Sequence, residues 1–322
     1  MNDLFASVDL GGTNIHAAIG RADGTLLAEE KVATASHEGP ERVLIRIAAL
    51  VQRLTHGAGA SLRAVGIGVP GLVDVDRGIT LFLPNLPTQW RDVGVRGELE
   101  PALGCPIHLL NDARAATLGE MTYGHGKQTR SLVYFGLGTG VGGGVVIDGK
   151  LRLGARGSAG EIGHQTILPD GPLCGCGNHG CLEALASGPA LTGEGVRLLL
   201  SGQAPRLHEI CAGDAAKVSP ATMGEAAHAG DTAVRAAIYR AGEYLGIAAA
   251  NLVSALHPEL VVLGGGVAEL GELLLVPIRN SLQYHVRMFS PDDVRVEQSA
   301  LGDRAGLMGG LALAHLGGIS TT

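Results

Sequence analysis

Hydrophobic and polar positions along this 322-residue chain follow two different periods. Short apolar runs bounded by glycine, proline or Asp-Gly turns predict strands at 64–69, 106–110, 131–137 and 260–263. Longer stretches with apolar residues every three or four positions predict helices at 40–56, 113–123, 231–256 and 302–316. Because strands and helices alternate, we expect an α/β protein with central mixed sheets.

Two segments share one plan, which indicates a duplicated fold. Residues 7–30 and 133–154 each contain an apolar strand, a Gly/Thr turn, a second apolar strand, an Asp-Gly turn and a third strand. Asp-Gly pairs favour hairpin turns because both residues tolerate positive φ. The length exceeds the roughly 100–200 residues of one domain. We therefore predict two α/β lobes, one of residues 1–118 with a C-terminal helix at about 302–322 packing back on it, and one of residues 119–301.

Composition and charge exclude several classes of protein. With 46% hydrophobic and 17% charged residues, the chain does not have the composition of a disordered protein. Its net charge of −7 argues against a nucleic-acid partner, whose recognition uses basic patches. No apolar run reaches the roughly 18 residues of a membrane span, and the N-terminus does not resemble a signal peptide. We expect a cytoplasmic protein with neither a nucleic-acid nor a membrane partner.

Glycine-rich turns provide the first candidate for chemistry. Each repeat places such a turn after its first strand, at 11–13 and at 138–140, where backbone N–H groups can approach an anion closely. Asp9 adds a carboxylate able to hold hydrated Mg²⁺. Either turn alone is equally a plain tight hairpin, whereas the pair in a duplicated frame favours a nucleotide clamp. The G-x-G-x-x-G patterns at 66–71 and 138–143 lack the following helix that a dinucleotide site requires.

Asn111 and Asp112 stand where a predicted strand meets a predicted helix. One interpretation is a helix cap, for which both residue types are common. The other is a general base that accepts a hydroxyl proton during phosphoryl transfer, with the asparagine orienting the substrate.

One histidine and three cysteines have the ligand count of a closed tetrahedral zinc site: His164, Cys174, Cys176 and Cys181. The glycines between the cysteines suit a loop wrapped around an ion. A catalytic zinc would keep an open position, so the predicted role is structural. The alternative is a set of unpaired buried cysteines.

Several motifs occur in a fixed order over essentially the whole chain: DLGGT, VGIGVPGLVD, LPNLPTQW, NDARAATLGE, GLGTGVGGGVVIDGK, AGEIGH, CGCGNHGCLEALAS and VVLGGGV. With this ordered set the sequence resembles the ROK family of repressors, open reading frames and sugar kinases, and within it the bacterial ATP-dependent glucokinases. The resemblance implies an actin/hexokinase-like (ribonuclease H-like) duplicated fold, with two lobes that close over ATP-Mg²⁺ and a hexose.

The resemblance also implies roles for individual residues. The phosphate-binding positions are Asp9, Gly11, Gly12 and Thr13 in the first turn and Gly138, Thr139 and Gly140 in the second. The adenosine-binding positions are Gly264, Gly265 and Gly266. The catalytic base is Asp112, and the sugar contacts are Asn85, Asn111, Asp112, Glu161, His164 and Glu183. The structural Zn²⁺ ligands are the histidine and three cysteines named above.

The implied reaction is transfer of the γ-phosphoryl group of ATP to the 6-hydroxyl of a hexose. Glucose is the substrate that the resemblance favours. Alternatives within the family are kinases of N-acetylmannosamine, N-acetylglucosamine or fructose, and polyphosphate as the donor. A sugar-responsive repressor is the alternative of another class; it would carry a helix-turn-helix region, for which Asp9 leaves no room here. The family suggests a homodimer or homotetramer. Arg114 departs from the small or polar residue that the family often shows. A guanidinium beside the base could lower the pKa of the base or contact phosphate; we favour the alternative, a helix residue that points to solvent.

Overall fold

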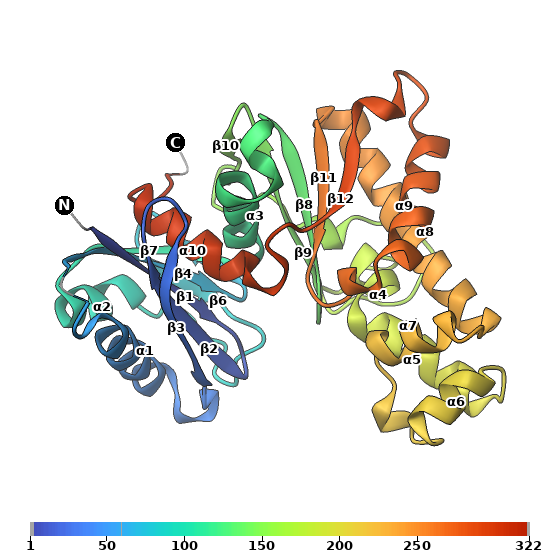
Figure 1. Cartoon of the computed structure of the whole chain (residues 1–322), viewed down its shortest axis with the longest axis horizontal. Helices are drawn as coiled ribbons and strands as arrows, with labels where there is room; N and C mark the ends of the chain where they lie inside the picture. Colours follow the sequence, from blue (N-terminus) through green and yellow to red (C-terminus); the bar gives the residue numbers. More distant parts are fainter. Residues whose placement is uncertain (1–2, 59, 321–322) are drawn as a thin grey trace. The chain divides into compact units, whose positions relative to one another are not determined.

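The computed structural model describes residues 3–58 and 60–320. The chain divides into two compact units. The first contains residues 1–130, 144–160 and 304–322, and the second contains 131–143 and 161–303. Two five-stranded sheets dominate the structure (Figure 1).

The first sheet has the strand order β3-β2-β1-β4-β7. Its strands are β1 (Leu4–Leu10), β2 (Asn14–Gly20), β3 (Leu26–Ala33), β4 (Leu62–Val69) and β7 (Ile107–Asn111). The first three strands pair antiparallel, and β4 and β7 continue the sheet parallel to β1. The central strands β1 and β4 are apolar nearly throughout because they are buried, whereas the edge strand β3 alternates between half-buried and exposed residues. A hairpin of β5 (Leu72–Asp74) and β6 (Ile79–Phe82) follows β4.

Four helices complete the first unit: α1 (Pro40–Thr55), α2 (Val95–Leu103), α3 (Asp112–Tyr123) and α10 (Ala305–His315). The C-terminal helix α10 packs against β1, β4 and α3 (Figure 1). Backbones approach closely at this contact. A Cβ atom on Gly66 would collide with the carbonyl of Gly310, and one on Gly309 would collide with the carbonyl of Ala115. Gly66 in β4 and Gly309 in α10 are therefore required by packing.

The second sheet repeats the plan of the first in the order β10-β9-β8-β11-β12. Its strands are β8 (Leu132–Leu137), β9 (Val141–Ile147), β10 (Lys150–Leu151), β11 (Leu260–Gly264) and β12 (Arg295–Gln298). In both sheets three consecutive strands are followed by two strands from later in the chain. The duplicated fold predicted from the two hairpin segments is thus confirmed, as is the α/β class.

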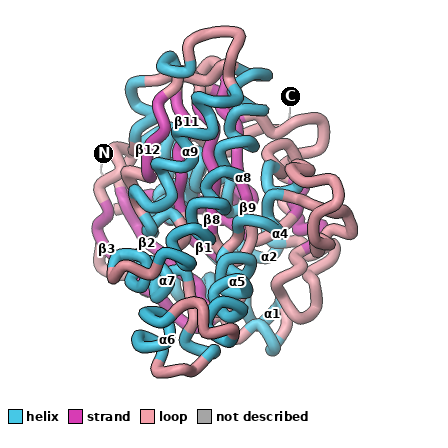
Figure 2. Tube along the Cα trace, turned by 90° about the vertical axis from the view of Figure 1, so that its right-hand side faces the viewer, coloured by secondary structure: helices cyan, strands magenta, loops and turns pink. Residues whose placement is uncertain are grey.

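Helices of the second unit are α4 (Leu182–Ala186), α5 (Gly188–Leu200), α6 (Pro205–Cys211), α7 (Pro220–His228), α8 (Thr232–Leu256) and α9 (Glu272–His285). Figure 2 shows α8 and α9 side by side over β11. Small residues permit this contact, since a Cβ atom on Gly246 would collide with Ser281. Among the described residues, no helix has both the length and the apolar character needed to cross a membrane.

The predicted strands and helices are all present, with ends displaced by about three residues at most. Sequence analysis did not predict β12, the β5–β6 hairpin or α2. The strand β12 is short and largely polar. The helix α2 contains Gly97 and Pro101, two residues that disfavour a helix interior.

Candidate active site and zinc centre

Asp9 and Asp112 lie at one edge of the first sheet. The parallel strands β1, β4 and β7 place Asp9 opposite Gly68, and β7 ends at Asn111 directly before Asp112. A Cβ atom on Gly68 would lie 3.8 Å from the Oδ1 atom of Asp9 and 3.6 Å from the Cα atom of Asp112. Gly68 therefore lies beside both acidic residues. Gly68 was absent from the predicted site; its sole signal was its place in the glycine pattern at 66–71.

The surroundings of the Asp9 carboxylate act on its pKa in opposite directions. Burial raises its pKa, while His16 and Lys31 on the neighbouring strands lower it. A Cβ atom on Gly306, in the first turn of α10, would lie 3.0 Å from the Oδ2 atom of Asp9. Asp9 is half-buried, and its carboxylate oxygens are the ligand type that a hydrated Mg²⁺ ion takes.

The first glycine turn, at Gly11–Thr13, is tied to the chain after β3. The Thr34 hydroxyl donates to the Gly11 carbonyl at 2.7 Å, and the Thr34 N–H donates to the Thr13 carbonyl at 2.8 Å. A Cβ atom on Gly12 would lie 3.2 Å from the carbonyl oxygen of Asn85. The structure thus brings predicted phosphate and sugar positions together within the first unit.

Asn111 is the N-cap of α3. Its Oδ1 atom accepts from the N–H groups of Ala113 and Arg114 at 3.1 and 3.3 Å. Its Nδ2 atom donates to the Gly71 carbonyl at 3.1 Å and to the Asp112 Oδ1 atom at 2.9 Å. An asparagine amide has two N–H donors and one acceptor oxygen. All of them are engaged, so Asn111 caps the helix and also orients the carboxylate of Asp112.

Arg114 does not point to solvent, and that interpretation was wrong. Its residue exposure is 1%. The Nε atom donates to the Ala159 carbonyl at 2.6 Å, and the Nη2 atom donates to the Ser158 carbonyl at 2.9 Å. The chain segment 154–160 covers this face of α3, which the helical pattern of residues 113–123 alone cannot reveal.

The second glycine turn, at Gly138–Gly140, lies beside Glu183 at the start of α4. The Val141 N–H donates to the Glu183 Oε2 atom at 3.0 Å, and the Gly188 N–H donates to the Gly138 carbonyl at 2.8 Å. A Cβ atom on Gly138 would meet nothing within 4 Å, whereas one on Gly140 would collide with the Glu183 carboxylate. The open side of this turn is therefore at Gly138.

The segment Gly264–Gly266 lies at the end of the neighbouring strand. Gly265 has a φ of +85°, and a Cβ atom there would collide with the Leu137 carbonyl. The Val267 N–H donates to the same carbonyl at 3.1 Å. Predicted adenosine and phosphate positions of the second unit are thus adjacent.

The predicted zinc ligands converge. The Nδ1 or Nε2 atom of His164 and the Sγ atoms of Cys174, Cys176 and Cys181 all lie within 4.8 Å of one another. Cys176 and Cys181 Sγ atoms are 3.7 Å apart, and Cys174 Sγ lies 3.7 Å from His164 Nδ1. Tetrahedral zinc with Zn–S bonds of about 2.3 Å requires ligand separations of about 3.5–3.8 Å. The cluster therefore fits zinc, with Nδ1 as the histidine ligand atom.

Two predicted sugar-binding carboxylates flank this cluster. The Glu183 Oε1 atom lies 3.8 Å from Cys174 Sγ, and the Glu161 Oε2 atom lies 3.9 Å from His164 Nε2. Without metal, burial raises the pKa of the Cys174 thiol and raises that of Cys181 to about 12. The Asn178 backbone N–H lowers the pKa of Cys176. Metal binding must therefore displace protons from buried thiols.

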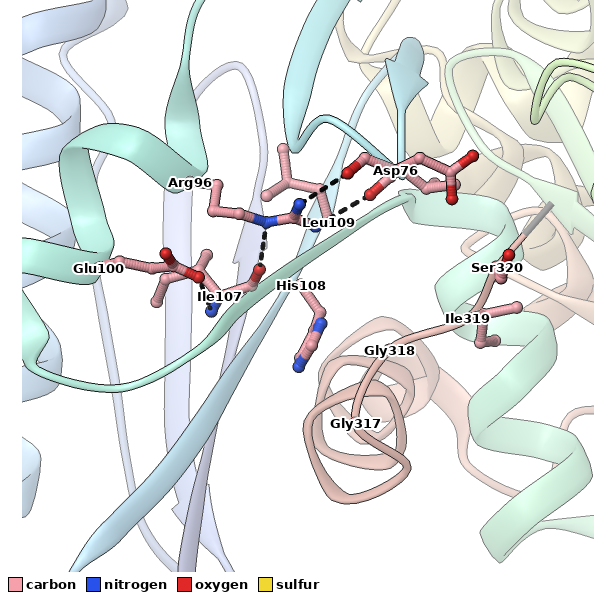
Figure 3. A pocket seen from close by; sticks show the side chains of 11 residues that line it. Asp76, Arg96, Glu100, Ile107, His108, Leu109, Gly317, Gly318, Ile319 and Ser320 are labelled. Carbon is pink, nitrogen blue, oxygen red and sulfur yellow. Dashed lines mark hydrogen bonds between the residues drawn. The ribbon is translucent and has the colours of Figure 1, made fainter. Parts of the chain in front are cut away.

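A pocket of about 460 Å³ in the first unit involves none of the predicted site residues. It lies at the start of β7, and Figure 3 shows Arg96 and His108 on its wall. The Arg96 guanidinium donates to the backbone carbonyls of Ile107, Asp76 and Val75 at 3.1, 2.7 and 2.9 Å. This arginine stabilises the fold of the first unit.

Two sheets of one plan, each with a glycine turn after its first strand, define an α/β protein of the actin/hexokinase-like class. The ROK family model matches residues 5–316, and the chain belongs to the ROK family. The resemblance inferred from the ordered motifs is confirmed.

Relatives of known structure and activity cover nearly the whole chain. A glucokinase from Halalkalibacterium halodurans is 35% identical over 95% of this chain and 93% of its own length. The crystal structure of a ROK family glucokinase from Streptomyces griseus in complex with glucose and AMPPNP is 36% identical, with a TM-score of 0.84 over 97% of this chain and 99% of that one. A ROK hexokinase from Thermus thermophilus is 38% identical, with a TM-score of 0.80 over 98% of both chains.

A relative of another class is also similar. A xylose repressor from Caldicellulosiruptor bescii is 33% identical over 95% of this chain and 76% of its own length. Similarity over the sugar-binding region is therefore shared by kinases and repressors, and the chemistry of the site must separate them.

Proposed function

We propose that the protein is an ATP-dependent hexose kinase that phosphorylates glucose at its 6-hydroxyl. The observation that carries the proposal is the geometry at Asp112, whose carboxylate accepts a hydrogen bond from Asn111 at the start of α3 and whose backbone lies, like the Asp9 carboxylate, beside Gly68. A base and a metal-holding carboxylate at one sheet edge are what phosphoryl transfer to a hydroxyl needs. The 35–38% identity to glucokinases and a hexokinase supports the same reaction.

Asp112 acts as the general base. It accepts the proton of the 6-hydroxyl while the hydroxyl oxygen forms a bond to the γ-phosphorus and the bond from that phosphorus to the β–γ bridging oxygen breaks. ADP leaves, and the products are ADP and the hexose 6-phosphate. Asn111 contributes by orienting the base, since its own donors and acceptor are engaged within the protein.

The phosphates of ATP bind at the turns containing Gly11, Gly12 and Thr13 and Gly138, Thr139 and Gly140. Asp9 would hold hydrated Mg²⁺, which would supply positive charge to neutralise the phosphates. Adenosine binds at Gly264 to Gly266. The open space above Gly138 supports this assignment because a phosphate oxygen needs that approach.

Asn85, Glu161, His164 and Glu183 bind the sugar hydroxyls and Asp112 contacts the 6-hydroxyl. For Asn111, the sixth predicted sugar contact, we propose the orientation of Asp112 in place of a direct contact. Zinc at the histidine and three cysteines keeps the segment between the two glutamates in one conformation, a structural role. By resemblance to the family, the small lobe comprises residues 1–118 with the C-terminal helix at about 302–322, and the large lobe comprises residues 119–301 with the zinc loop. By family resemblance we also propose a homodimer or homotetramer that acts in the cytoplasm, where ATP is available and thiols stay reduced.

The test is ADP release with a panel of hexoses, with ATP and polyphosphate compared as donors. We expect glucose to exceed N-acetylmannosamine, N-acetylglucosamine and fructose in kcat/KM by at least about tenfold, or about 1.4 kcal/mol. A carboxylate that the bound sugar covers and leaves without a hydroxyl donor costs about 1–3 kcal/mol, which disfavours analogues. The similarity to the xylose repressor gives a second candidate, a sugar sensor. Sugar binding without ADP release for any hexose would favour the sensor.

A further inference from the structure

A buried arginine joins the helix of the proposed base to the segment that leads into Glu161. Arg114 is two residues after Asp112 on α3 and is 1% exposed. Its guanidinium donates to two successive carbonyls, those of Ser158 and Ala159, at 2.9 and 2.6 Å. Hydrogen bonds from a charged donor are roughly twice as strong as those between neutral groups. Because the guanidinium is planar and rigid, it fixes the positions of both carbonyl acceptors at once.

Two short-range backbone hydrogen bonds involve the segment 154–160: the Ala159 N–H donates to the Leu153 carbonyl at 2.9 Å and the Gly157 N–H to the Gly154 carbonyl at 3.5 Å. The segment contains no helix or strand. Gly154, Gly157 and Gly160 all have positive φ, at 69°, 77° and 97°. Glycine loses more conformational entropy on ordering than any other residue, so this segment needs strong contacts to hold one shape. The Arg114 hydrogen bonds supply two, directly before Gly160 and Glu161.

We infer that Arg114 is a positioning residue for sugar binding. It clamps the main chain that enters Glu161 and so fixes the direction from which that carboxylate meets the hexose. The inference rests on the proposed function, because Glu161 is proposed to read the sugar. Because Arg114 acts on the sugar through the position of Glu161, its loss should weaken glucose binding more than it slows the chemical step.

The chain offers a matched control for a purely structural arginine. Arg96 also donates to backbone carbonyls within the first unit, those of Val75, Asp76 and Ile107 (Figure 3). None of these three carbonyls belongs to a residue one or two positions before a proposed site residue. Replacing either arginine by glutamine leaves carbonyls without their charged donor, so both variants should lose stability.

The experiment compares Arg114→Gln, Arg114→Lys and Arg96→Gln with the wild-type protein. KM for glucose, KM for ATP, kcat and Tm are measured for each. For Arg114→Gln we expect KM for glucose to rise about tenfold or more, with KM for ATP within about twofold and a smaller fall in kcat. Arg114→Lys keeps the positive charge but lacks the planar guanidinium that donates to both carbonyls. Its KM for glucose should lie between those of the wild type and Arg114→Gln. Arg96→Gln should lower Tm without changing KM for glucose.

Equal falls in Tm for Arg114→Gln and Arg96→Gln, with KM for glucose within about twofold of wild type in both, would overturn the inference. If Arg114→Gln does not fold, the same comparison of Tm and of KM for glucose is made with Arg114→Lys. A wild-type protein that binds glucose in calorimetry but releases no ADP would contradict the proposed kinase instead. The Kd for glucose would then replace KM in the comparison of variants. A wild-type protein that binds no hexose would contradict both proposals.

Discussion

The backbone N–H of Val141 donates a 3.0 Å hydrogen bond to the Oε2 atom of Glu183. The other oxygen of that carboxylate lies 3.8 Å from the Sγ atom of Cys174. One side chain thus adjoins both the second glycine turn and the cysteine cluster. A change in the glycine turn should therefore alter the cysteine cluster, and a change in the cluster should alter the turn. We expect loss of the metal to lower turnover through Glu183.

Two glycines of the second turn should respond differently to alanine. Gly140→Ala places a methyl group against the Glu183 carboxylate and should lower kcat/KM for glucose at least about tenfold. Gly138→Ala meets no protein atom within 4 Å, so the fold should tolerate it. If a phosphate occupies that space, KM for ATP rises about tenfold while KM for glucose is unchanged. An unchanged KM for ATP would mean that the turn is a hairpin without a phosphate role.

Zinc should copurify at about one ion per chain, as measured by elemental analysis. Cys176→Ser should lower the metal content and the activity together, because the segment between Glu161 and Glu183 loses its anchor. Cys211→Ser, at a buried cysteine outside the cluster, is the control and should keep the zinc.

The pH dependence of zinc binding has a definite sign. The metal-free thiols of Cys174 and Cys181 have raised pKa values, so protons must be displaced when the ion binds. Zinc affinity should therefore fall as pH is lowered, as measured by competition with a chelator. Freshly purified active protein without zinc would exclude the metal site.

Asp9→Asn should separate stability from activity. Burial raises the pKa of Asp9 in the folded chain, so its favourable contribution is complete below the unfolded pKa of about 3.9 and is lost as pH rises through the folded value. Without ATP and Mg²⁺ at pH 7.5, the asparagine variant should have a higher Tm than the wild type. The difference should shrink as pH falls toward 4.

In the same variant kcat/KM should fall by at least about 10², because the metal-bound phosphates lose their carboxylate. A lower Tm at pH 7.5 would show that the ionised Asp9 stabilises the fold instead.

Glycine substitutions in the first unit test the packing of α10. Gly309→Ala collides with the backbone of Ala115 in α3 and should destabilise the protein by about 1–3 kcal/mol or more. Gly97→Ala, at an exposed position in α2 with no atom within 4 Å, should stabilise it by about 0.4–1 kcal/mol. Chemical denaturation checks both values. Equal stability of the two variants would contradict the described contact.

Local signals explain why much of the fold was predictable. Asp148 and Gly149 adopt φ values of 55° and 75°, as their residue types favour in a hairpin turn. The close spacing of the cysteines likewise predicted the metal cluster, since a short loop keeps their sulfur atoms near one another. The role of Asn111 as both cap and orienting group, and the burial of Arg114, depend on chain segments 40 and 45 residues away. Residue spacing along a helix carries no information about such partners.

The most direct test of the account is the single-turnover rate of glucose phosphorylation by Asp112→Asn, measured with glucose and ATP saturating. The proposed mechanism predicts a rate about 10²–10⁴ below wild type, with Kd for glucose within about twofold and an unchanged Tm, because only the proton acceptor is lost. A variant that transfers the phosphoryl group at nearly the wild-type rate would contradict the role of Asp112 and the mechanism built on it.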